Sequence, residues 1–132
     1  MDLIVALDTN AYCDFRSSGL WRDMLAQADR VLIPSPVIGE LMHGFRIGKH
    51  FKMHKTELEE FLKESQVEVV TVSKRTGEIY AEILEHLQKM EIPVPTNDIW
   101  IASIAIENYA ILLTSDPHFT AIPNLKLNTP EE

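Results

Sequence analysis

The sequence predicts an α/β fold, a three-layer α/β/α arrangement around a central, mainly parallel sheet of four to five strands. Short apolar runs alternate along the chain with longer segments whose apolar residues recur at helical spacing. Strands separated by helices pair in parallel, with the helices covering both faces of the sheet. The first run is apolar throughout, without polar residues between, which is typical of a strand buried on both faces.

Size and composition predict a single domain, residues 1–132. The chain has 132 residues and is 45% hydrophobic, enough for a real core. One cysteine, Cys13, excludes an internal disulfide framework and favours a reducing cytoplasm. We expect Cys13 to be a small buried residue. No run reaches the length of a transmembrane helix, so we expect no membrane association.

The first half of the chain reads as two strands and their helices. In order, we expect a strand at Leu3–Leu7, mainly helix over Asn10–Ala28 with a break at Ser17–Gly19, a strand at Val31–Ile33, a helix running to about Gly48, and a helix over Lys52–Glu64. Ser35 is the expected N-cap of the third helical segment, with Pro36 at its first position.

The second half continues the alternation. In order, we expect a β-branched strand at Val67–Val72, an amphipathic helix over Thr76–Met90, a helix that Thr96 caps and that begins near Asp98, a strand at Ile111–Leu113, and a short edge strand at Leu125–Leu127. Pro93 and Pro95 separate the two helices. The segment Ile99–Ile106 is almost wholly apolar, which predicts a helix buried on several sides.

Four acidic residues stand at the ends of these elements: Asp8, Glu40, Asp98 and Asp116. In parallel α/β sheets ligands bind beyond the carboxyl ends of the strands, so all four can reach one crevice. Such a group repels itself unless a cation fills it. Oxygen ligands suit Mg²⁺ or Mn²⁺, and Mg²⁺ held by carboxylates usually acts on phosphates.

Each acid taken alone also has an ordinary interpretation. Asp8 could end a strand in a turn, and Glu40 could lie on the surface of a helix. Asp98 could be a first-turn acid favoured by the helix dipole, and Asp116 could start a turn. The presence of all four in these contexts, in this order, favours a site.

The motifs around the four acids point to one family. They are Asp8-Thr9-Asn10 at a strand end, Glu40 in PSPVIGEL, Asn97-Asp98 running to Ile101-Ala102, and Asp116 in LLTSDPHF. In order and spacing they resemble the PIN-domain ribonucleases, and in detail the VapC-type toxins of toxin–antitoxin pairs. The resemblance covers nearly the whole chain. Ser115 departs from it mildly, since many relatives carry a basic or amide residue there.

The resemblance implies a PIN-like fold and an endoribonuclease that cleaves RNA phosphodiester bonds with Mg²⁺ (or Mn²⁺). It also implies a small antitoxin partner, whose tail can place a basic side chain in the acidic pocket. Asp8 and Asp98 are the first candidates for direct metal ligands, and Asp116 would complete the shell directly or through water. Glu40 would bind a second metal or orient the attacking water. One or two ions remain open.

Further residues are candidates for supporting contacts. Thr9 and Asn97 could fix a carboxylate or contact phosphate, although Thr9 could equally bond its own backbone. Positive charge is concentrated in Arg46–Lys55, against a formal net charge of −8 for the chain. We expect RNA contacts there from Arg46, Lys49, Lys52 and Lys55. The alternative is an ordinary solvated connection between helices. We interpret His118, near the predicted site, as a turn residue.

Two other classes of function compete with a nuclease. A phospho-accepting signalling domain on a similar sheet needs an aspartate after the third strand, but Val72 is followed by Ser73-Lys74. A noncatalytic RNA- or protein-binding module would be favoured if one of the four acids were missing, and none is.

A homodimer is expected from two apolar surfaces. They are the Ile99–Ile106 helix and the helical stripe made by Tyr80, Ile83, Leu84 and Leu87. A domain of this size has limited room to hide both internally.

Overall fold

The computed structural model describes residues 2–130. In chain order the elements are β1 (Ile4–Leu7), α1 (Thr9–Ser18), α2 (Arg22–Gln27), β2 (Arg30–Pro34), α3 (Ser35–Ile47), α4 (Phe51–Leu62), β3 (Val67–Val70), α5 (Lys74–Lys89), α6 (Thr96–Glu107), β4 (Ile111–Leu113), the short 3₁₀ helix η1 (Pro117–Ala121) and β5 (Lys126–Asn128). The elements expected from the sequence are present, with boundaries shifted by a few residues.

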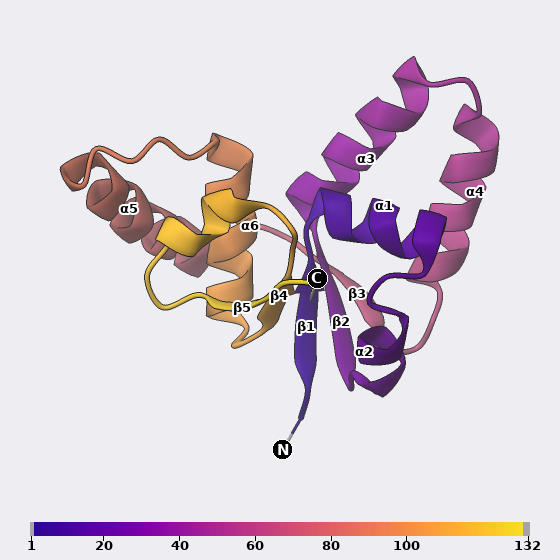
Figure 1. Cartoon of the computed structure of the whole chain (residues 1–132), viewed down its shortest axis with the longest axis horizontal. Helices are drawn as coiled ribbons and strands as arrows, with labels where there is room; N and C mark the ends of the chain where they lie inside the picture. The colour runs from indigo at the N-terminus through magenta and orange to yellow at the C-terminus, as the bar shows by residue number, and fades with distance from the viewer. Residues whose placement is uncertain (1, 131–132) are drawn as a thin grey trace.

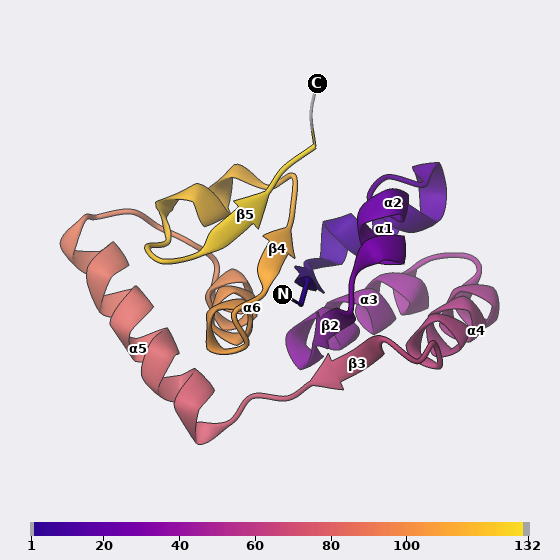
Figure 2. The ribbon, with the colours of Figure 1, turned by 90° about the horizontal axis from the view of Figure 1, so that it is seen from below.

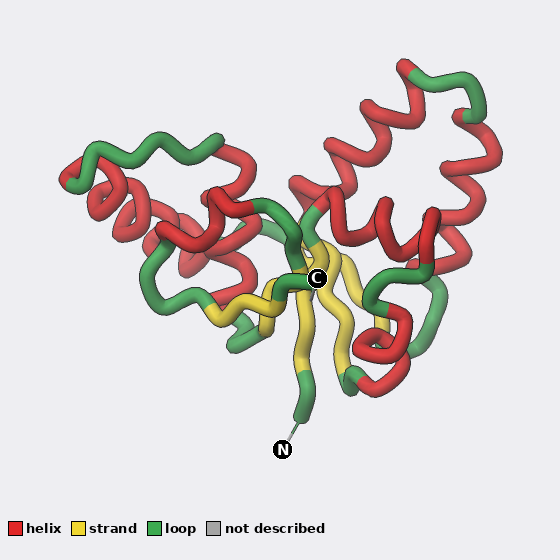
Figure 3. The backbone as a smooth tube through the Cα atoms, viewed as in Figure 1, coloured by secondary structure: helices red, strands yellow, loops and turns green. Residues whose placement is uncertain are grey.

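The sheet has five strands in the order β3-β2-β1-β4-β5, and every neighbouring pair in it is parallel. The expected α/β fold with a mainly parallel sheet of four to five strands is therefore confirmed. Strand β1 lies in the middle, and Leu7 at its end stands opposite Leu113 at the end of β4. Because all strands run the same way, their carboxyl ends share one edge, uppermost in Figures 1 and 3.

The helices form a layer on each side of the sheet. Seen along the strands, α1, α2 and α4 lie on one side, and α5 and α6 lie on the other (Figure 2). The sheet is the centre of the core, since Val5, Leu7, Leu32 and Leu112 are fully buried. A strand covered on both faces can be apolar at every position, which explains the continuous apolar run of β1.

Helix α6 is largely buried within the domain, which corrects one premise of the dimer prediction. Ile99, Ile101 and Ile104 are buried, because α6 packs against α5, α3 and the sheet. The stripe on α5 faces the same core, and its Tyr80 stacks on Trp100 of α6 with ring centroids 3.9 Å apart. The expectation that the domain cannot hide both surfaces is therefore wrong for α6.

Three local expectations also differ from the structure. Ser35 and Thr96 are the first residues of their helices, and Pro34 and Pro95 occupy the cap positions without a side-chain cap. A proline has the fixed φ that suits the extended cap residue. Cys13 is exposed instead of buried, because the inward face of α1 runs through Ala11 and Tyr12.

Candidate functional site

The four acids line one pocket of about 480 Å³ at the carboxyl end of the sheet. The pocket is bounded by Asp8, Thr9, Asn10, Glu40, Pro95, Thr96, Asn97, Asp98, Asp116 and His118. Asp8 follows β1 and Asp116 follows β4, whereas Glu40 lies on α3 and Asp98 in the first turn of α6. Segments far apart in the sequence thus supply one acidic cavity.

Asp8 is both a helix cap and a pocket residue. Its Oδ1 accepts the backbone N–H of Ala11 at 2.7 Å, and its Oδ2 accepts the hydroxyl of Thr114. The carboxyl is buried, and burial is the main cause of its raised pKa. Asp8 therefore caps α1 and also lines the pocket, and its role as a metal ligand stays a prediction.

Thr114 was not anticipated from the sequence. Its buried hydroxyl donates to Asp8 and accepts the backbone N–H of Asp116 at 2.9 Å, so it joins two of the four acids. The contact depends on β1 and β4 being neighbours in the sheet. No local sequence pattern predicts that β1 and β4 are neighbours, although the sequence does show a threonine directly after a strand.

Glu40 is held by Thr9. The Thr9 hydroxyl donates to Glu40 Oε1 at 2.7 Å across the start of α1 and the middle of α3. Thr9 therefore fixes a carboxylate, which was one of its two expected uses. Asn97 lines the same pocket but makes no hydrogen bond to the acids in the part of the chain that the structure describes.

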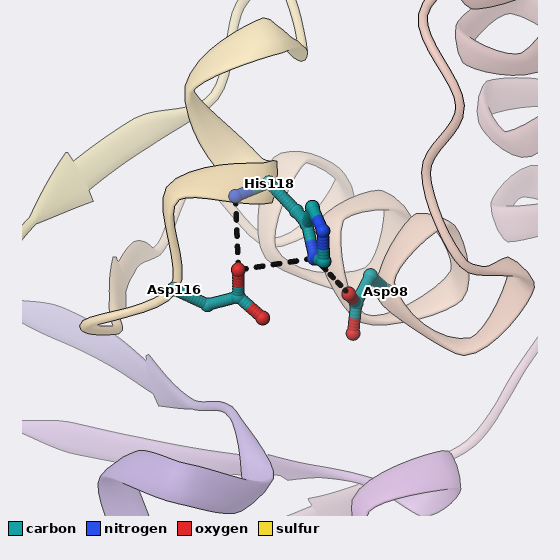
Figure 4. A group of neighbouring side chains, drawn as sticks. All are labelled: Asp98, Asp116 and His118. Carbon is teal, nitrogen blue, oxygen red and sulfur yellow. Dashed lines mark hydrogen bonds and ion pairs between the residues drawn. The ribbon is translucent and has the colours of Figure 1, made fainter.

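His118 lies between Asp98 and Asp116 (Figure 4). Its Nδ1 is 3.0 Å from Asp116 Oδ1 and 3.6 Å from Asp98 Oδ2. Its backbone N–H also donates to Asp116 Oδ1 at 2.9 Å. The turn interpretation of His118 is correct as far as it goes, but the side chain also belongs to the pocket. The motif DPHF, with an imidazole two residues after an acid, was the signal for it.

Burial and neighbouring acids raise the pKa values of two of the acids, Asp8 and Asp98. Burial, followed by repulsion from Asp116 and Glu40, raises the pKa of Asp98 to about 6, whereas His118 lowers it. A divalent cation would relieve this repulsion, and carboxylate oxygens are the donors that Mg²⁺ and Mn²⁺ prefer. One donor atom each from Asp98, Asp116 and His118 lies within 4.8 Å of the other two. The residues present therefore fit a divalent metal centre.

The basic segment lies away from the acidic pocket. Arg46, Lys49, Lys52 and Lys55 are exposed around the connection between α3 and α4, at the upper right in Figure 1. Two side chains are already engaged, since Arg46 lies over the Phe51 ring at 4.7 Å and Lys55 pairs with Glu59 at 3.5 Å. None of the four basic residues lines the acidic pocket.

A second, more apolar groove adjoins the acidic pocket. It has a volume of about 530 Å³ and runs between α1, α3 and α4. Tyr12, Leu41, Phe45 and Met53 are among its lining residues. It shares Thr9 and Glu40 with the acidic pocket, so the two cavities adjoin at this hydrogen-bonded pair.

Comparison with known proteins identifies the family. The family model "PIN domain" matches residues 5–125. Ribonuclease VapC2 of Rickettsia felis is 32% identical over 106 residues, covering 80% of this chain and 78% of that protein. Ribonuclease VapC4 of Mycobacterium tuberculosis is 25% identical over 92 residues, covering 70% of this chain and 71% of that protein. The chain belongs to the PIN-domain family.

Solved structures place the chain within that family more closely. It superposes on VapBC2 from Rickettsia felis, bound to a DNA fragment from its promoter, with a TM-score of 0.86 and 28% identity, covering 98% of this chain and 100% of that one. VapBC-1 from nontypeable Haemophilus influenzae gives 0.86 at 22% identity, covering 96% and 98%, and supports the fold alone. Within the PIN-domain family, the chain is therefore of the VapC type.

Two further observations concern membrane-spanning helices and the segment after β3. Among the described residues, no helix has both the length and the apolar character needed to cross a membrane. The residues that follow β3, Thr71 to Ser73, contain no aspartate. The PIN-domain assignment takes the place of the phospho-accepting signalling domain as the class of this protein.

Proposed function

We propose that the chain is a metal-dependent endoribonuclease that cleaves RNA phosphodiester bonds with Mg²⁺ or Mn²⁺, and that it is the toxin of a VapBC-type pair. The observation that carries the proposal is the gathering of Asp8, Glu40, Asp98 and Asp116 in one pocket of a PIN-domain chain. Relatives named as ribonucleases support RNA as the substrate. The single cysteine favours a reducing cytoplasm as the compartment.

The four acids have distinct roles in this proposal. A bound divalent ion supplies charge stabilisation on the phosphate and a more acidic water. Asp98 and Asp116 offer oxygens toward the pocket, and Thr114 orients Asp8 and Asp116 together. Glu40, held by Thr9, is placed to orient the attacking water or to support a second ion. Asn97, without a partner among the acids, is available to contact phosphate.

The direct test is RNA cleavage by the purified protein. We expect cleavage with Mg²⁺ or Mn²⁺ and none in EDTA. Asp8→Asn and Asp98→Asn should each lower the rate at least about a hundredfold, the scale of losing a key electrostatic group. Asparagine also caps helices, so Asp8→Asn should leave α1 intact. Asp23→Asn, an exposed acid of α2, is the matched control.

The same assay separates an enzyme from a noncatalytic RNA-binding module. Full activity in EDTA, or in either pocket variant, would contradict the metal mechanism. RNA binding without cleavage under any divalent ion would favour the binding module. Thermal unfolding of each variant shows whether a lost rate reflects lost chemistry or lost folding.

The proposed protein partner is the extended or helical tail of a small antitoxin. The apolar groove beside α1 and α3 adjoins the acidic pocket at Thr9 and Glu40, so one segment that crosses both can pack apolar residues in the groove and place an arginine among the acids. Four carboxylates in one cavity complement that charge. The solved relatives described above are VapBC complexes, which supports a partner of this kind.

Co-purification from the native host tests this partner. We expect a small protein to accompany the chain, and a peptide from its tail to inhibit cleavage. Changing the arginine of that peptide to alanine should weaken inhibition by about tenfold or more, as expected for a charge-assisted contact in a buried site. If no small protein co-purifies, and expression of the active chain alone does not slow growth, the toxin assignment fails.

A further inference from the structure

The imidazole of His118 is positioned like a metal ligand. Its Nδ1 is 3.0 Å from Asp116 Oδ1 and 3.6 Å from Asp98 Oδ2 (Figure 4). Neighbouring ligands around an octahedral ion with metal–ligand distances of about 2.1 Å lie about 3 Å apart. The shorter separation matches neighbouring ligands of one ion, and all three donor atoms lie within 4.8 Å of one another. The longer one exceeds a hydrogen bond and lies within ion-pair range, so the contact with Asp98 is electrostatic.

The local backbone holds the ring in this place. Asp116 caps η1 by accepting the backbone N–H of His118 at 2.9 Å, and its own N–H donates to Thr114 at 2.9 Å. Pro117 restricts the backbone between the two pocket residues. The His118 side chain is 50% exposed, whereas that of Asp98 is 16% exposed. The imidazole thus lines the pocket while half exposed, and it is not a core residue.

The other two acids are held by hydrogen bonds of their own. Both oxygens of Asp8 accept hydrogen bonds, from Ala11 and Thr114. Glu40 accepts a bond from Thr9. Neither acid belongs to the group of close donor atoms formed by Asp98, Asp116 and His118.

We propose that His118 is a nitrogen ligand of the ion held by Asp98 and Asp116, and that it shifts the preference of the site from Mg²⁺ toward Mn²⁺. The inference rests on the metal centre of the proposed function. Imidazole is a common ligand of first-row transition metals, whereas Mg²⁺ keeps to oxygen ligands. A mixed nitrogen and oxygen ligand set therefore favours Mn²⁺ over Mg²⁺.

The competing interpretation of the same contacts makes the opposite prediction. If Nδ1–H only bridges the carboxylates in the absence of metal, the imidazole must leave when an ion binds. Removing His118 would then tighten metal binding. If His118 is a ligand, removing it weakens Mn²⁺ binding more than Mg²⁺ binding.

Calorimetric titration with MnCl₂ and MgCl₂ at one fixed pH distinguishes the two. For His118→Asn we expect Mn²⁺ affinity to fall at least about tenfold and Mg²⁺ affinity to change less, as expected for loss of one imidazole ligand. His43→Asn, which replaces an exposed histidine of α3 outside the pocket, should change neither affinity. Pulsed electron paramagnetic resonance of bound Mn²⁺ should show nitrogen coupling in the wild type and in His43→Asn, but none in His118→Asn.

Two results would overturn the inference: unchanged or tighter Mn²⁺ binding in His118→Asn, or the absence of nitrogen coupling in the wild type. If Mn²⁺ binds the wild type, is lost in Asp98→Asn and shows no nitrogen coupling, the metal centre survives and only the role of His118 fails. If Mn²⁺ does not bind the wild type at all, the metal centre of the proposed function fails as well.

Discussion

The surroundings of Asp98 in the pocket raise its pKa. Its side chain is mostly buried, and Asp116, Glu40 and Asp8 all disfavour its charged form. A carboxyl in this position costs stability when ionised and becomes useful when a cation compensates it. The burial and repulsion that destabilise the metal-free fold therefore also favour the binding of a cation.

The pKa of Asp98 predicts a pH dependence of stability in EDTA. Its pKa is about 6 in the folded chain, against 3.8 for an aspartate free of these effects, so between these values the folded state holds more protons than the unfolded state. Its contribution to stability is full below the lower value and is lost as pH rises through about 6. We expect the wild type to lose up to about 3 kcal/mol relative to Asp98→Asn across that range.

Urea unfolding of both proteins in EDTA, at several pH values, measures this difference. Asp23→Asn, measured against the wild type, is the control for removing an exposed acid. Parallel stability curves for the wild type and Asp98→Asn would show that repulsion in the pocket is weaker than the geometry implies.

At the scale of elements, the sequence predicted the sheet and its helices because apolar periodicity is a local signal. It also predicted that the acids converge, since the carboxyl ends of parallel strands meet at one edge. It could not predict Thr114 as a partner of Asp8, because the adjacency of β1 and β4 is not encoded locally. The apolar α6 suggested a subunit contact, but only the packing of α5 across it shows that it is core.

The connection between α3 and α4 is predicted to contact RNA electrostatically. Changing Lys49, Lys52 and Lys55 to alanine should weaken RNA binding and reduce the log–log salt slope by roughly 0.7 for each lost single-strand phosphate contact. Metal binding should not change, because these side chains lie outside the acidic pocket.

A triple variant of Lys74, Lys89 and Lys126 removes the same charge from α5 and β5 and serves as the control. Equal salt slopes of RNA binding for the two triple variants would mean that the effect comes from net charge alone. An unchanged slope in the first variant would mean that the segment is only surface, or that it serves a protein partner.

At the scale of the whole molecule, a homodimer remains a prediction, now on different grounds. The surface of α6 is used within the chain, but β3 is an edge strand and leaves apolar side chains in solvent. Val69 of β3 is 44% exposed, and Val72, two residues beyond the end of the strand, is 43% exposed. An open edge with apolar side chains is a common place for a second chain to pair or pack.

Light scattering after size exclusion measures the oligomeric state directly. We expect a dimer at micromolar concentration, and a monomer for the double variant Val69→Lys and Val72→Lys. Ile47→Lys, at the exposed end of α3, is the control and should stay dimeric. A monomeric wild type would contradict the prediction, and a dimeric double variant would exclude this edge as the interface.

The central claim is that four acids drawn from across the fold make this chain an RNA-cleaving enzyme. The measurement that tests it most directly is sequencing of RNA ends after the wild type or Asp98→Asn is induced in cells. We expect new, discrete RNA ends with the wild type, at sites shared between repeated experiments, and their absence with Asp98→Asn at equal protein level. The same ends in both samples, or no new ends with a folded wild-type protein, would contradict it.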